Sequence, residues 1–529
     1  MTMKFILCLI ITLGYSYSQS WIRTYNGPAN NYDLASKNTV DRNGNIFVTG
    51  YSKGINNSDT NFDYCTIKYN SAGTEQWIRR YNGNDNVDDV ALSIATDSTG
   101  NCYVTGNIND HQWVDMDIGT IKYSSSGEML WVARYATQYE DWGSDVVVDR
   151  QGNVYVTGHT YVSPESMRSI TIKYDSNGVQ QWVAIDSITS WTFSIGLDSF
   201  NNIYVAGTGY TIIKYNQNGE RQWRVNNSMP GSIIKLDVTP RGEVYVTGES
   251  VAQSNSNIVT AKYNTFGQEQ WRRTFDGPGH GDDRGQSLAI DNQGNVYVTG
   301  RAATQSGPYK YYFDIVTIKY TTDGDEQWVR LYDGFGSDDC AYDVKVDADK
   351  SVYVCGFSIG NHPPIWDDDA VVVKYDSLGN LLWIDRYNGP TNGWDWFYSL
   401  AIGNDGSVYA SGYTDRQYPD RDYLTIQYPP YGPGIEEKPA LSKIIPDIKI
   451  SPNPFQNRVR FDILISQYAY KIKIYRVDGR LVKTFNNITS SFIYWDGKDD
   501  TGNILPPGVY FVDVTNGYNR LNQRLVIMK

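Results

Sequence analysis

The sequence is poor in the residues on which many catalytic and metal sites depend. Its 529 residues include only four His and five Cys. No Cys-x-x-Cys pair or other metal-type spacing of cysteines occurs. No His lies near a Ser in a recognisable nucleophile turn; the four are His111, His159, His280 and His362. These absences argue against a zinc centre and against a Ser–His hydrolase.

Clustered positive charge and long apolar runs are also missing. The 46 Lys and Arg against 59 Asp and Glu give a formal net charge of −13, whereas phosphate contacts need grouped basic residues, so nucleic acid is not expected as a partner. The apolar run at residues 5–13 is too short to span a bilayer as a helix. It follows Lys4 and precedes Ser16-Tyr17-Ser18, which predicts a signal peptide over residues 1–18. We therefore expect an exported protein without a transmembrane segment.

One repeated pattern dominates what is present. The word Gly-Asn-x-Tyr-Val-Thr-Gly, or a weaker version of it, occurs eight times, at residues 44–50, 100–106, 152–158, 201–207, 242–248, 294–300, 350–356 and 406–412. A period of about 40–56 residues is typical of repeat architectures such as propellers. The composition, with 14% aromatic and 20% charged residues, favours β-structure.

Each repeat contains four short apolar runs, of which the word forms the second. Thr-Ile-Lys-Tyr or a variant of it is the third, and a Trp opens the fourth: Trp77, Trp131, Trp182, Trp223, Trp271, Trp328 and Trp383. The eighth repeat ends at Tyr428 without a Trp, whereas Trp21 precedes the first repeat. Four-stranded sheets repeated around an axis form a β-propeller, and closing the ring removes exposed sheet edges. The sequence predicts an all-β fold with an eight-bladed propeller over residues 19–428, closed by pairing of residues 21–25 with 424–428.

Several repeated residues are open to a structural and a functional interpretation. A Trp at a fixed position in each repeat is expected to pack between sheets. The repeated Lys, such as Lys68, either pairs with the Asp that ends the first strand or lies along the sheet with its charge toward water. Cys340 and Cys355 share one repeat, so they either form a disulfide or stay as buried thiols.

The repeats resemble the bacterial β-propeller repeat family that is often called the seven-bladed propeller repeat, although this chain has eight units. The resemblance covers about 400 residues; it implies the fold and an extracellular setting, but no chemistry. After a Pro/Gly-rich linker at residues 429–446, residues 447–529 resemble the C-terminal sorting domain of type IX secretion cargo. The motifs that carry this resemblance are Ser451-Pro452-Asn453-Pro454-Phe455, Pro507-Gly508-Val509-Tyr510-Phe511 and the terminal apolar strand. It implies an Ig-like β-sandwich, the type IX secretion machinery as a partner, and a secreted or outer-membrane surface location.

Candidate binding residues lie in the variable connections on one face of the expected ring. Loops on a rigid scaffold commonly carry binding residues. The aromatic candidates for a glycan or protein ligand are Tyr309, Tyr311, Tyr312, Trp366, Trp394 and Trp396.

A second candidate set is a series of acids, each eight residues before the end of the first strand in its repeat: Asp33, Asp89, Asp141, Asp283, Asp339 and Asp395. Either each Asp caps its own connection through backbone N–H groups, or several of them share a cation such as calcium. No other cofactor and no catalytic residue is predicted.

Three functions remain open at this point. The chain is expected to be a binding or adhesion module on the cell surface rather than an enzyme, because its acids recur with the repeat instead of occurring once, as a catalytic pair would. The alternatives are an extracellular hydrolase or lyase acting on polysaccharide and a purely structural surface component. Fold alone does not separate these functions.

Overall fold

The structure is a computed structural model. It describes residues 21–528 except 56–60, 84–86, 110–115, 188–189, 227–229, 253–254, 307–310, 336, 361–366, 418–419, 431–447, 452–453, 464–469, 477–479, 489–491 and 516–519. The chain divides into two compact units between Gly434 and Ile435. The predicted signal peptide and residues 431–446 of the predicted linker lie outside the described residues. Within the described ranges, no helix is long and apolar enough to cross a membrane.

In its described residues, the first unit is built of eight antiparallel four-stranded sheets. Their first strands are β2 (Asp33–Val40), β6 (Val90–Thr96), β10 (Asp141–Val148), β14 (Thr192–Leu197), β18 (Gly231–Val238), β22 (Arg284–Ile290), β26 (Asp339–Val346) and β30 (Asp395–Ile402). The second strands are β3 (Ile46–Lys53), β7 (Cys102–Asn109), β11 (Val154–Ser163), β15 (Ile203–Gly207), β19 (Val244–Ala252), β23 (Val296–Ser306), β27 (Val352–Ile359) and β31 (Val408–Gln417).

The outer half of each sheet follows in the same order. The third strands are β4 (Phe62–Tyr69), β8 (Met116–Tyr123), β12 (Ser166–Tyr174), β16 (Thr211–Tyr215), β20 (Asn255–Tyr263), β24 (Tyr311–Tyr320), β28 (Asp368–Tyr375) and β32 (Asp420–Tyr428). The outermost strands are β5 (Glu75–Tyr81), β9 (Met129–Tyr135), β13 (Gln180–Ile185), β17 (Arg221–Asn226), β21 (Glu269–Phe275), β25 (Glu326–Tyr332), β29 (Leu381–Tyr387) and, in the eighth sheet, β1 (Ile22–Tyr25).

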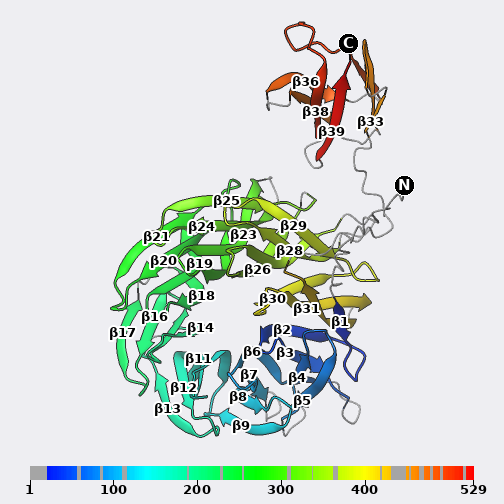
Figure 1. The fold of residues 1–529 in the computed structure, drawn as a ribbon. Coiled ribbons are helices and arrows are strands. Elements are labelled where there is room, and N and C mark those ends of the chain that lie inside the picture. Colours follow the sequence, from blue (N-terminus) through cyan, green and yellow to red (C-terminus); the bar gives the residue numbers. More distant parts are fainter. Residues whose placement is uncertain are drawn as a thin grey trace, which may run out of the picture. The chain divides into compact units, whose positions relative to one another are not determined.

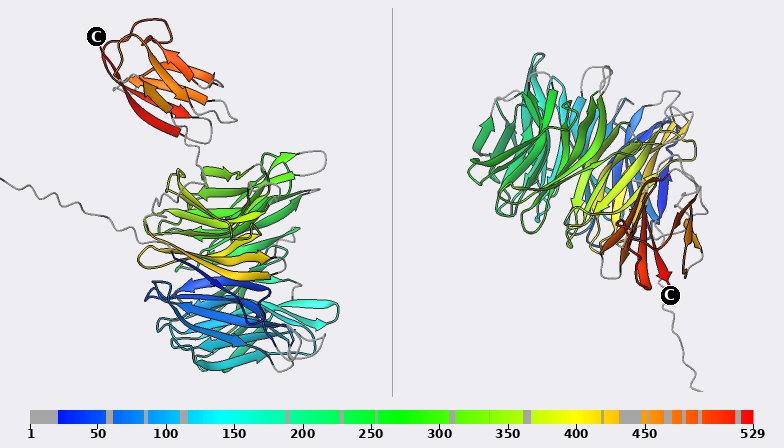
Figure 2. Two further views of the ribbon diagram at one scale, coloured as in Figure 1. Left: turned by 90° about the vertical axis from the view of Figure 1, so that its right-hand side faces the viewer. Right: turned by 90° about the horizontal axis from the view of Figure 1, so that it is seen from above.

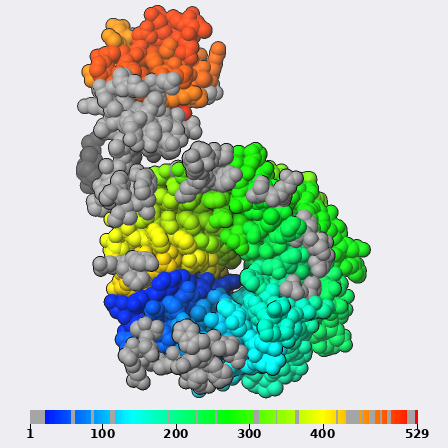
Figure 3. Space-filling view, turned by 180° about the vertical axis from the view of Figure 1, so that it is seen from behind, coloured from blue at the N-terminus to red at the C-terminus, as the bar shows by residue number. Residues whose placement is uncertain are grey.

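The sheets are arranged around a central axis (Figure 1). Each first strand contacts the first strands of the two neighbouring sheets, and β2 contacts β30, so the contacts run all the way round. The first and last sheets lie side by side in the other views as well: blue and yellow strands are adjacent in Figure 2, and the blue and yellow surfaces meet in Figure 3. Residues at the two ends of the repeat array are therefore brought together by the fold.

The predicted pairing of the N-terminal strand is confirmed. β1 pairs antiparallel with β32, with Ile22 opposite Ile426 and Tyr25 opposite Tyr423. The Trp21 carbonyl also accepts a hydrogen bond from the Gln427 backbone N–H at 3.0 Å. Without β1, the backbone groups of β32 on this side would form an unpaired sheet edge.

The repeated Trp joins seven of the eight sheets to the next one by a hydrogen bond. Trp77 in the first sheet is 6% exposed, and its Nε1 donates to the Ser125 carbonyl in the second sheet at 3.2 Å. The same turn contains Gly127, where φ is 83° and an added Cβ would lie 2.7 Å from the Trp77 ring. Six other Trp residues make the equivalent bond to the next sheet: Trp21, Trp131, Trp182, Trp223, Trp271 and Trp328. The structural interpretation of these residues is confirmed.

The repeated Lys binds the same turn of the next sheet. Lys68 Nζ donates to the Ser125 carbonyl at 2.7 Å and lies 4.9 Å from the centre of the Phe47 ring, which is a cation–π contact. Among the described residues, no repeated Lys forms an ion pair with the Asp that ends a first strand. That Asp instead stabilises its own turn, because Asp41 Oδ1 accepts from the backbone N–H groups of Asn43 and Asn45.

The possible disulfide between Cys340 and Cys355 is not formed. Both thiols are free and buried, as are those of Cys65 and Cys102. Cys340 lies opposite Phe357 in the pairing of β26 with β27, whereas Cys355 lies opposite Asp343. The alternative of buried thiols is therefore the correct one.

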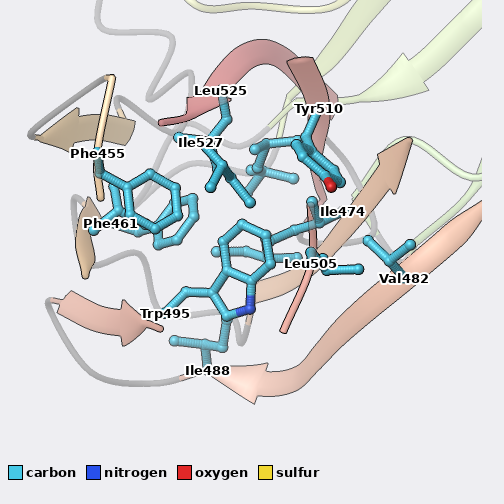
Figure 4. Packing of buried hydrophobic residues seen from close by; sticks show 14 residues of the cluster. Phe455, Phe461, Ile474, Val482, Ile488, Trp495, Leu505, Tyr510, Leu525 and Ile527 are labelled. Atoms are coloured by element: carbon cyan, nitrogen blue, oxygen red, sulfur yellow. The ribbon is translucent and has the colours of Figure 1, made fainter. Parts of the chain in front are cut away.

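The second unit is a small β-sandwich. One sheet contains β33 (Ile448–Ser451), β34 (Val459–Ile463) and β37 (Phe492–Trp495); the other contains β36 (Leu481–Ile488), β35 (Tyr470–Arg476), β38 (Gly508–Thr515) and β39 (Arg520–Ile527). Both sheets contribute to one hydrophobic core around Trp495, which is 2% exposed (Figure 4). The Trp495 Nε1 donates to the Lys498 carbonyl at 2.8 Å, so the buried indole is satisfied.

Candidate ligand-binding site

Every first strand of the ring contains a β-bulge, at which one of its residues has no partner in the second strand. In β26 the ladder skips Tyr342, and in β30 it skips Tyr398. The skipped residues of the other six sheets are Ser36, Leu92, Ser144, Phe193, Ile234 and Gln286. A bulge bends its strand and re-aims the skipped side chain, and bulges are common beside functional sites. Only the fourth, seventh and eighth sheets place an aromatic residue there.

Aromatic side chains gather where the seventh, eighth and first sheets meet, at the end of the sheets that carries the long connections. We call this cluster the aromatic platform; it consists of Tyr32, Tyr51, Phe62, Tyr342, Phe357, Trp394, Trp396, Tyr398 and Tyr413. Most of its members are half-buried, and Trp394 is 44% exposed. Partly exposed rings of this kind supply apolar area to a bound ligand.

The platform is continuous because its rings contact one another or share one guanidinium group. Trp396 stacks on Phe357 with ring centroids 4.4 Å apart, and Tyr342 lies 5.9 Å from Trp396. The guanidinium carbon of Arg421 lies 4.2 Å from the centre of Tyr413 and 4.8 Å from the centre of Tyr32. Arg421 thus connects the rings of the eighth sheet to those of the first.

The positive charge of Arg421 is already balanced. Its Nε donates to Asp415 Oδ1 at 3.0 Å, and its Nη1 donates to the Tyr32 hydroxyl at 2.6 Å. On the other side of the platform, Trp396 Nε1 donates to Asp368 Oδ2 at 2.9 Å. The platform therefore presents rings held by buried polar contacts rather than a cationic surface for an anion.

Burial also acts on the phenol groups of the platform. It raises the pKa values of Tyr342 and Tyr398 above their ordinary value. Phenols are protonated at neutral pH even at their ordinary pKa, so both carry an O–H donor. Burial raises the pKa of Asp368 to about 6, with the Trp396 hydrogen bond acting in the opposite direction.

The six predicted acids make the hydrogen bonds that the capping interpretation requires. Asp283, which is fully buried, accepts from the backbone N–H of Gly277 and of Ala303, both at 2.7 Å. In this way one carboxylate joins the incoming connection to the second strand of its sheet. Asp33, Asp89 and Asp339 accept two such bonds in the same way, and Asp141 and Asp395 accept one from the incoming connection. Calcium binding by these carboxylates remains a prediction.

One acidic cluster in the described residues has the spacing of a metal site. Carboxylate oxygens of Asp314, Asp333 and Asp339 lie within 4.8 Å of one another. Asp339 belongs to the predicted series, whereas the other two come from the sixth sheet and its following connection. Asp314 is engaged by the Thr304 hydroxyl at 2.8 Å, and burial raises its pKa to about 6.

Below the platform, the first strands carry charges of alternating sign. The residue after each bulge is, in sheet order, Lys37, Ser93, Asp145, Ser194, Lys235, Ser287, Asp343 and Ser399. Lys37 Nζ lies 3.6 Å from Asp145, and Ser93 donates to the same carboxylate at 2.6 Å. A cavity of about 390 Å³ lies next to these residues, lined in part by Lys37, Asp343 and Ser399. Two Lys and two Asp leave this ring of residues without net charge.

The predicted aromatic candidates have different positions in the structure. Trp394 and Trp396 lie in the platform, as β30 begins between them. Tyr312 is half-buried on β24 in the sixth sheet, which neighbours the seventh sheet but contributes no ring to the platform. Tyr311 opens the same strand, whereas Tyr309 and Trp366 lie outside the described residues.

Sequence reasoning missed the other seven members of the platform, although the repeat contains a signal for five of them. Tyr51, Phe357 and Tyr413 each directly follow the last Gly of the repeated word, and Tyr342 and Tyr398 occupy the bulge position. An alignment of the eight repeats would have shown aromatic residues in these two columns. Such an alignment does not show that residues in both columns lie at the same end of the ring.

Comparison with known families identifies both parts of the chain. The family model described as "Beta-propeller repeat" matches residues 130–164 and 277–303. The model described as "Secretion system C-terminal sorting domain" matches residues 449–528. Sorting domains of this family belong to proteins that are secreted or displayed at the cell surface.

Individual relatives are distant. An uncharacterized WD repeat-containing protein, L264, of Acanthamoeba polyphaga mimivirus is 31% identical over 145 residues, which is 23% of this chain and only 10% of that protein. The chain thus spans a small part of that relative.

Among solved structures, the Dos1 propeller has a TM-score of 0.50 at 9% identity, covering 77% of this chain and 95% of that one. PorZ, described as an essential surface component of the type IX secretion system of Porphyromonas gingivalis, has a TM-score of 0.26 at 11% identity, covering 96% and 100%. BamB from Moraxella catarrhalis has a TM-score of 0.42 at 13% identity, covering 78% and 99%. At these identities, the likeness to the Dos1 propeller supports the fold alone. The chain therefore contains β-propeller repeats at residues 130–164 and 277–303, followed by a secretion system C-terminal sorting domain at residues 449–528.

Proposed function

We propose that this chain is a secreted, surface-displayed glycan-binding protein that uses the aromatic platform as its binding site. Its eight sheets act as an eight-bladed propeller closed by β1, and its second unit acts as an Ig-like domain that the type IX machinery reads during export. The observation that carries the proposal is the continuous set of rings around Trp394 and Trp396, at the end of the ring with the long connections.

The chemistry of the platform favours a sugar as ligand. Sugar rings present apolar C–H faces that stack on indole and phenol rings, and their hydroxyl groups pair with neutral donors and carboxylate acceptors. The protonated phenols of Tyr342 and Tyr398 and the carboxylate of Asp368 supply both kinds of partner. Because Arg421 is already bound by Asp415, an anionic ligand gains little here.

A glycan array tests this proposal with one exposed Trp removed. We expect Trp394→Ala to weaken glycan binding by about tenfold or more, as for an aromatic hot spot. Phe266→Ala is the matched control, because Phe266 is 77% exposed in a turn between third and fourth strands, at the other end of the sheets. Equal binding by wild type and Trp394→Ala would contradict the proposal. Release of reducing ends from a bound polysaccharide would instead indicate a hydrolase.

A further inference from the structure

A second aromatic cluster lies in the third and fourth sheets. Trp142 stacks on His159 with ring centroids 5.9 Å apart and an interplanar angle of 8°, and His159 stacks on Trp191 at 5.6 Å and 18°. Phe193, at the bulge of the fourth sheet, meets Trp191 edge-on at 6.4 Å. Trp191 is 45% exposed, so this stack of rings reaches the solvent.

This second cluster occupies the same positions in its sheets as the platform does. Trp142 directly follows the buried Asp141 and lies opposite His159, just as Trp396 directly follows Asp395 and lies opposite Tyr413. Both clusters therefore open at the same end of the ring. Because the third and fourth sheets are four places from the seventh and eighth in a ring of eight, the second cluster lies across the central axis from Tyr342 and Trp396, as β14 and β30 show in Figure 1. Only the second sheet separates the platform rings of the first sheet from the third sheet.

The sheets between the two clusters do not continue the aromatic surface. In the second sheet the corresponding positions hold Val90 and Asn107, and in the sixth sheet they hold Arg284 and Arg301. The two clusters are thus separate aromatic surfaces. A ligand that touches both Trp191 and Trp396 has to extend across the central axis at this end of the ring.

Charge at the second cluster agrees with an uncharged ligand. Trp142 Nε1 donates to Glu140 Oε2 at 3.2 Å, so the polar edge of this indole is held by a carboxylate, as that of Trp396 is. Burial lowers the pKa of His159 to about 4, so the ring between the two indoles is neutral at neutral pH. The ring of Lys and Asp residues on the first strands is formally neutral, and Arg284 of the sixth sheet lies 3.5 Å from Glu249 of the fifth.

We propose that Trp142, His159 and Trp191 form a second sugar subsite, and that the ligand is an uncharged polysaccharide chain that lies across the central axis at this end of the ring and contacts both clusters. This inference rests on the proposed glycan binding by the platform and names the class of its ligand. Two linked contacts of one chain raise the affinity well above that of either alone. A disaccharide is too short to bridge sheets on opposite sides of the ring and engages one cluster at a time.

Affinity electrophoresis of the full chain tests the inference in gels containing laminarin, xyloglucan or galactomannan, with alginate as the acidic polymer. We expect retardation by a neutral polymer and none by alginate. Trp191→Ala should weaken binding of that neutral polymer by about tenfold or more, and Trp142→Ala should do the same. Binding of the corresponding disaccharide at the platform should be unchanged by Trp191→Ala, and Phe266→Ala should behave as wild type. Melting curves show which variants are folded, and Trp191→Gln replaces any alanine variant that is not.

The outcomes separate the inference from the proposal on which it rests. If Trp394→Ala weakens polymer binding and a folded Trp191 variant does not, the second subsite is wrong while the platform stands. Retardation by alginate as strong as by neutral polymers overturns the uncharged ligand. If no polymer retards the wild type, glycan binding itself is wrong, and the second subsite is wrong with it.

Discussion

In six of the eight sheets, a buried Asp at the start of the first strand accepts hydrogen bonds from the backbone of neighbouring segments. Asp339 accepts the backbone N–H of Gly334 at 2.7 Å and that of Ile359 at 3.2 Å, although its side chain is almost fully buried. Buried carboxylates are stable only where such donors satisfy them, and desolvation still disfavours their charged form. The stability of the propeller unit should therefore depend on the ionisation of these six Asp residues, and hence on pH.

We expect the melting temperature of the propeller unit to rise as the pH is lowered from 8.5 to 6.5. Burial raises the pKa of Asp339 and of Asp395 from 3.8 to about 7. A carboxyl group whose pKa is raised in the folded state contributes stability that is complete below its unfolded pKa of 3.8 and is lost as the pH rises through about 7. Differential scanning calorimetry at several pH values measures this dependence.

The matched variant is Asp395→Asn, which keeps an oxygen acceptor for Gly389 and cannot ionise. Its melting temperature should depend less on pH over the same range than that of the wild type. Burial lowers the pKa of His159 from 6.5 to about 4, so His159 makes the folded state less stable as the pH falls. This opposite effect on the melting temperature begins only below pH 6.5. If the melting temperature of the wild type decreases as the pH is lowered from 8.5 to 6.5, this account is wrong.

The buried Trp residues make a second prediction at this scale. Trp271 is 8% exposed and donates to the Thr322 carbonyl at 2.9 Å. Trp271→Ala should lower the free energy of unfolding by about 3–5 kcal/mol, as for other buried aromatic residues. Trp271→Phe should cost less, because it keeps most of the ring and loses the hydrogen bond. Chemical denaturation measures both, with Trp191→Ala as an exposed control that changes stability little.

At the scale of elements, the decisive strand is β1. Among the described strands of the propeller unit, it is the only outer strand that is far in sequence from the rest of its sheet. It covers the edge of β32, and Trp21 Nε1 donates to the Ser71 carbonyl of the first sheet at 3.1 Å. The eighth and first sheets are thus joined by the same Trp bond that joins most other neighbours.

Deletion of residues 20–26 should therefore lower the denaturation midpoint of the propeller unit and broaden its transition. The deletion exposes the edge of β32 and removes the Trp21 contact with the turn at Gly73. A permuted chain in which residues 20–26 follow residue 430 attaches the same strand to the C-terminal end of β32. It should recover the wild-type midpoint. Identical unfolding of the deletion and the wild type would show that β1 is dispensable.

At the scale of the whole molecule, the chain consists of two units with separate cores. The described core of the second unit, around Phe461 and Trp495, is built from residues after 447, Ile450 included. Removal of residues 435–529 should accordingly leave the melting temperature and the glycan binding of the propeller unit unchanged, while abolishing export. A fall in the propeller's melting temperature on truncation would show that the two units stabilise each other.

Much of the fold was predictable because repetition makes each local signal appear eight times. The turn at Asp41, the Trp at position 77 and the unpaired Trp21 sufficed to predict the sheets and the pairing of β1 with β32. The candidate site was predictable only in part. Trp394 and Trp396 were found because they lie in a long connection, whereas Tyr342 and Tyr398 lie inside regular strands, where a bulge changes their direction.

The sequence by itself determined the strands, their order and the chain end that completes the eighth sheet, because these depend on local turn chemistry and on a periodic pattern. It also determined that the chain carries a sorting domain. Only the tertiary structure decided which aromatic residues form one surface. Tyr32 and Tyr413 are far apart in the chain, yet Arg421 lies over both rings, because closing the ring places the first sheet beside the eighth.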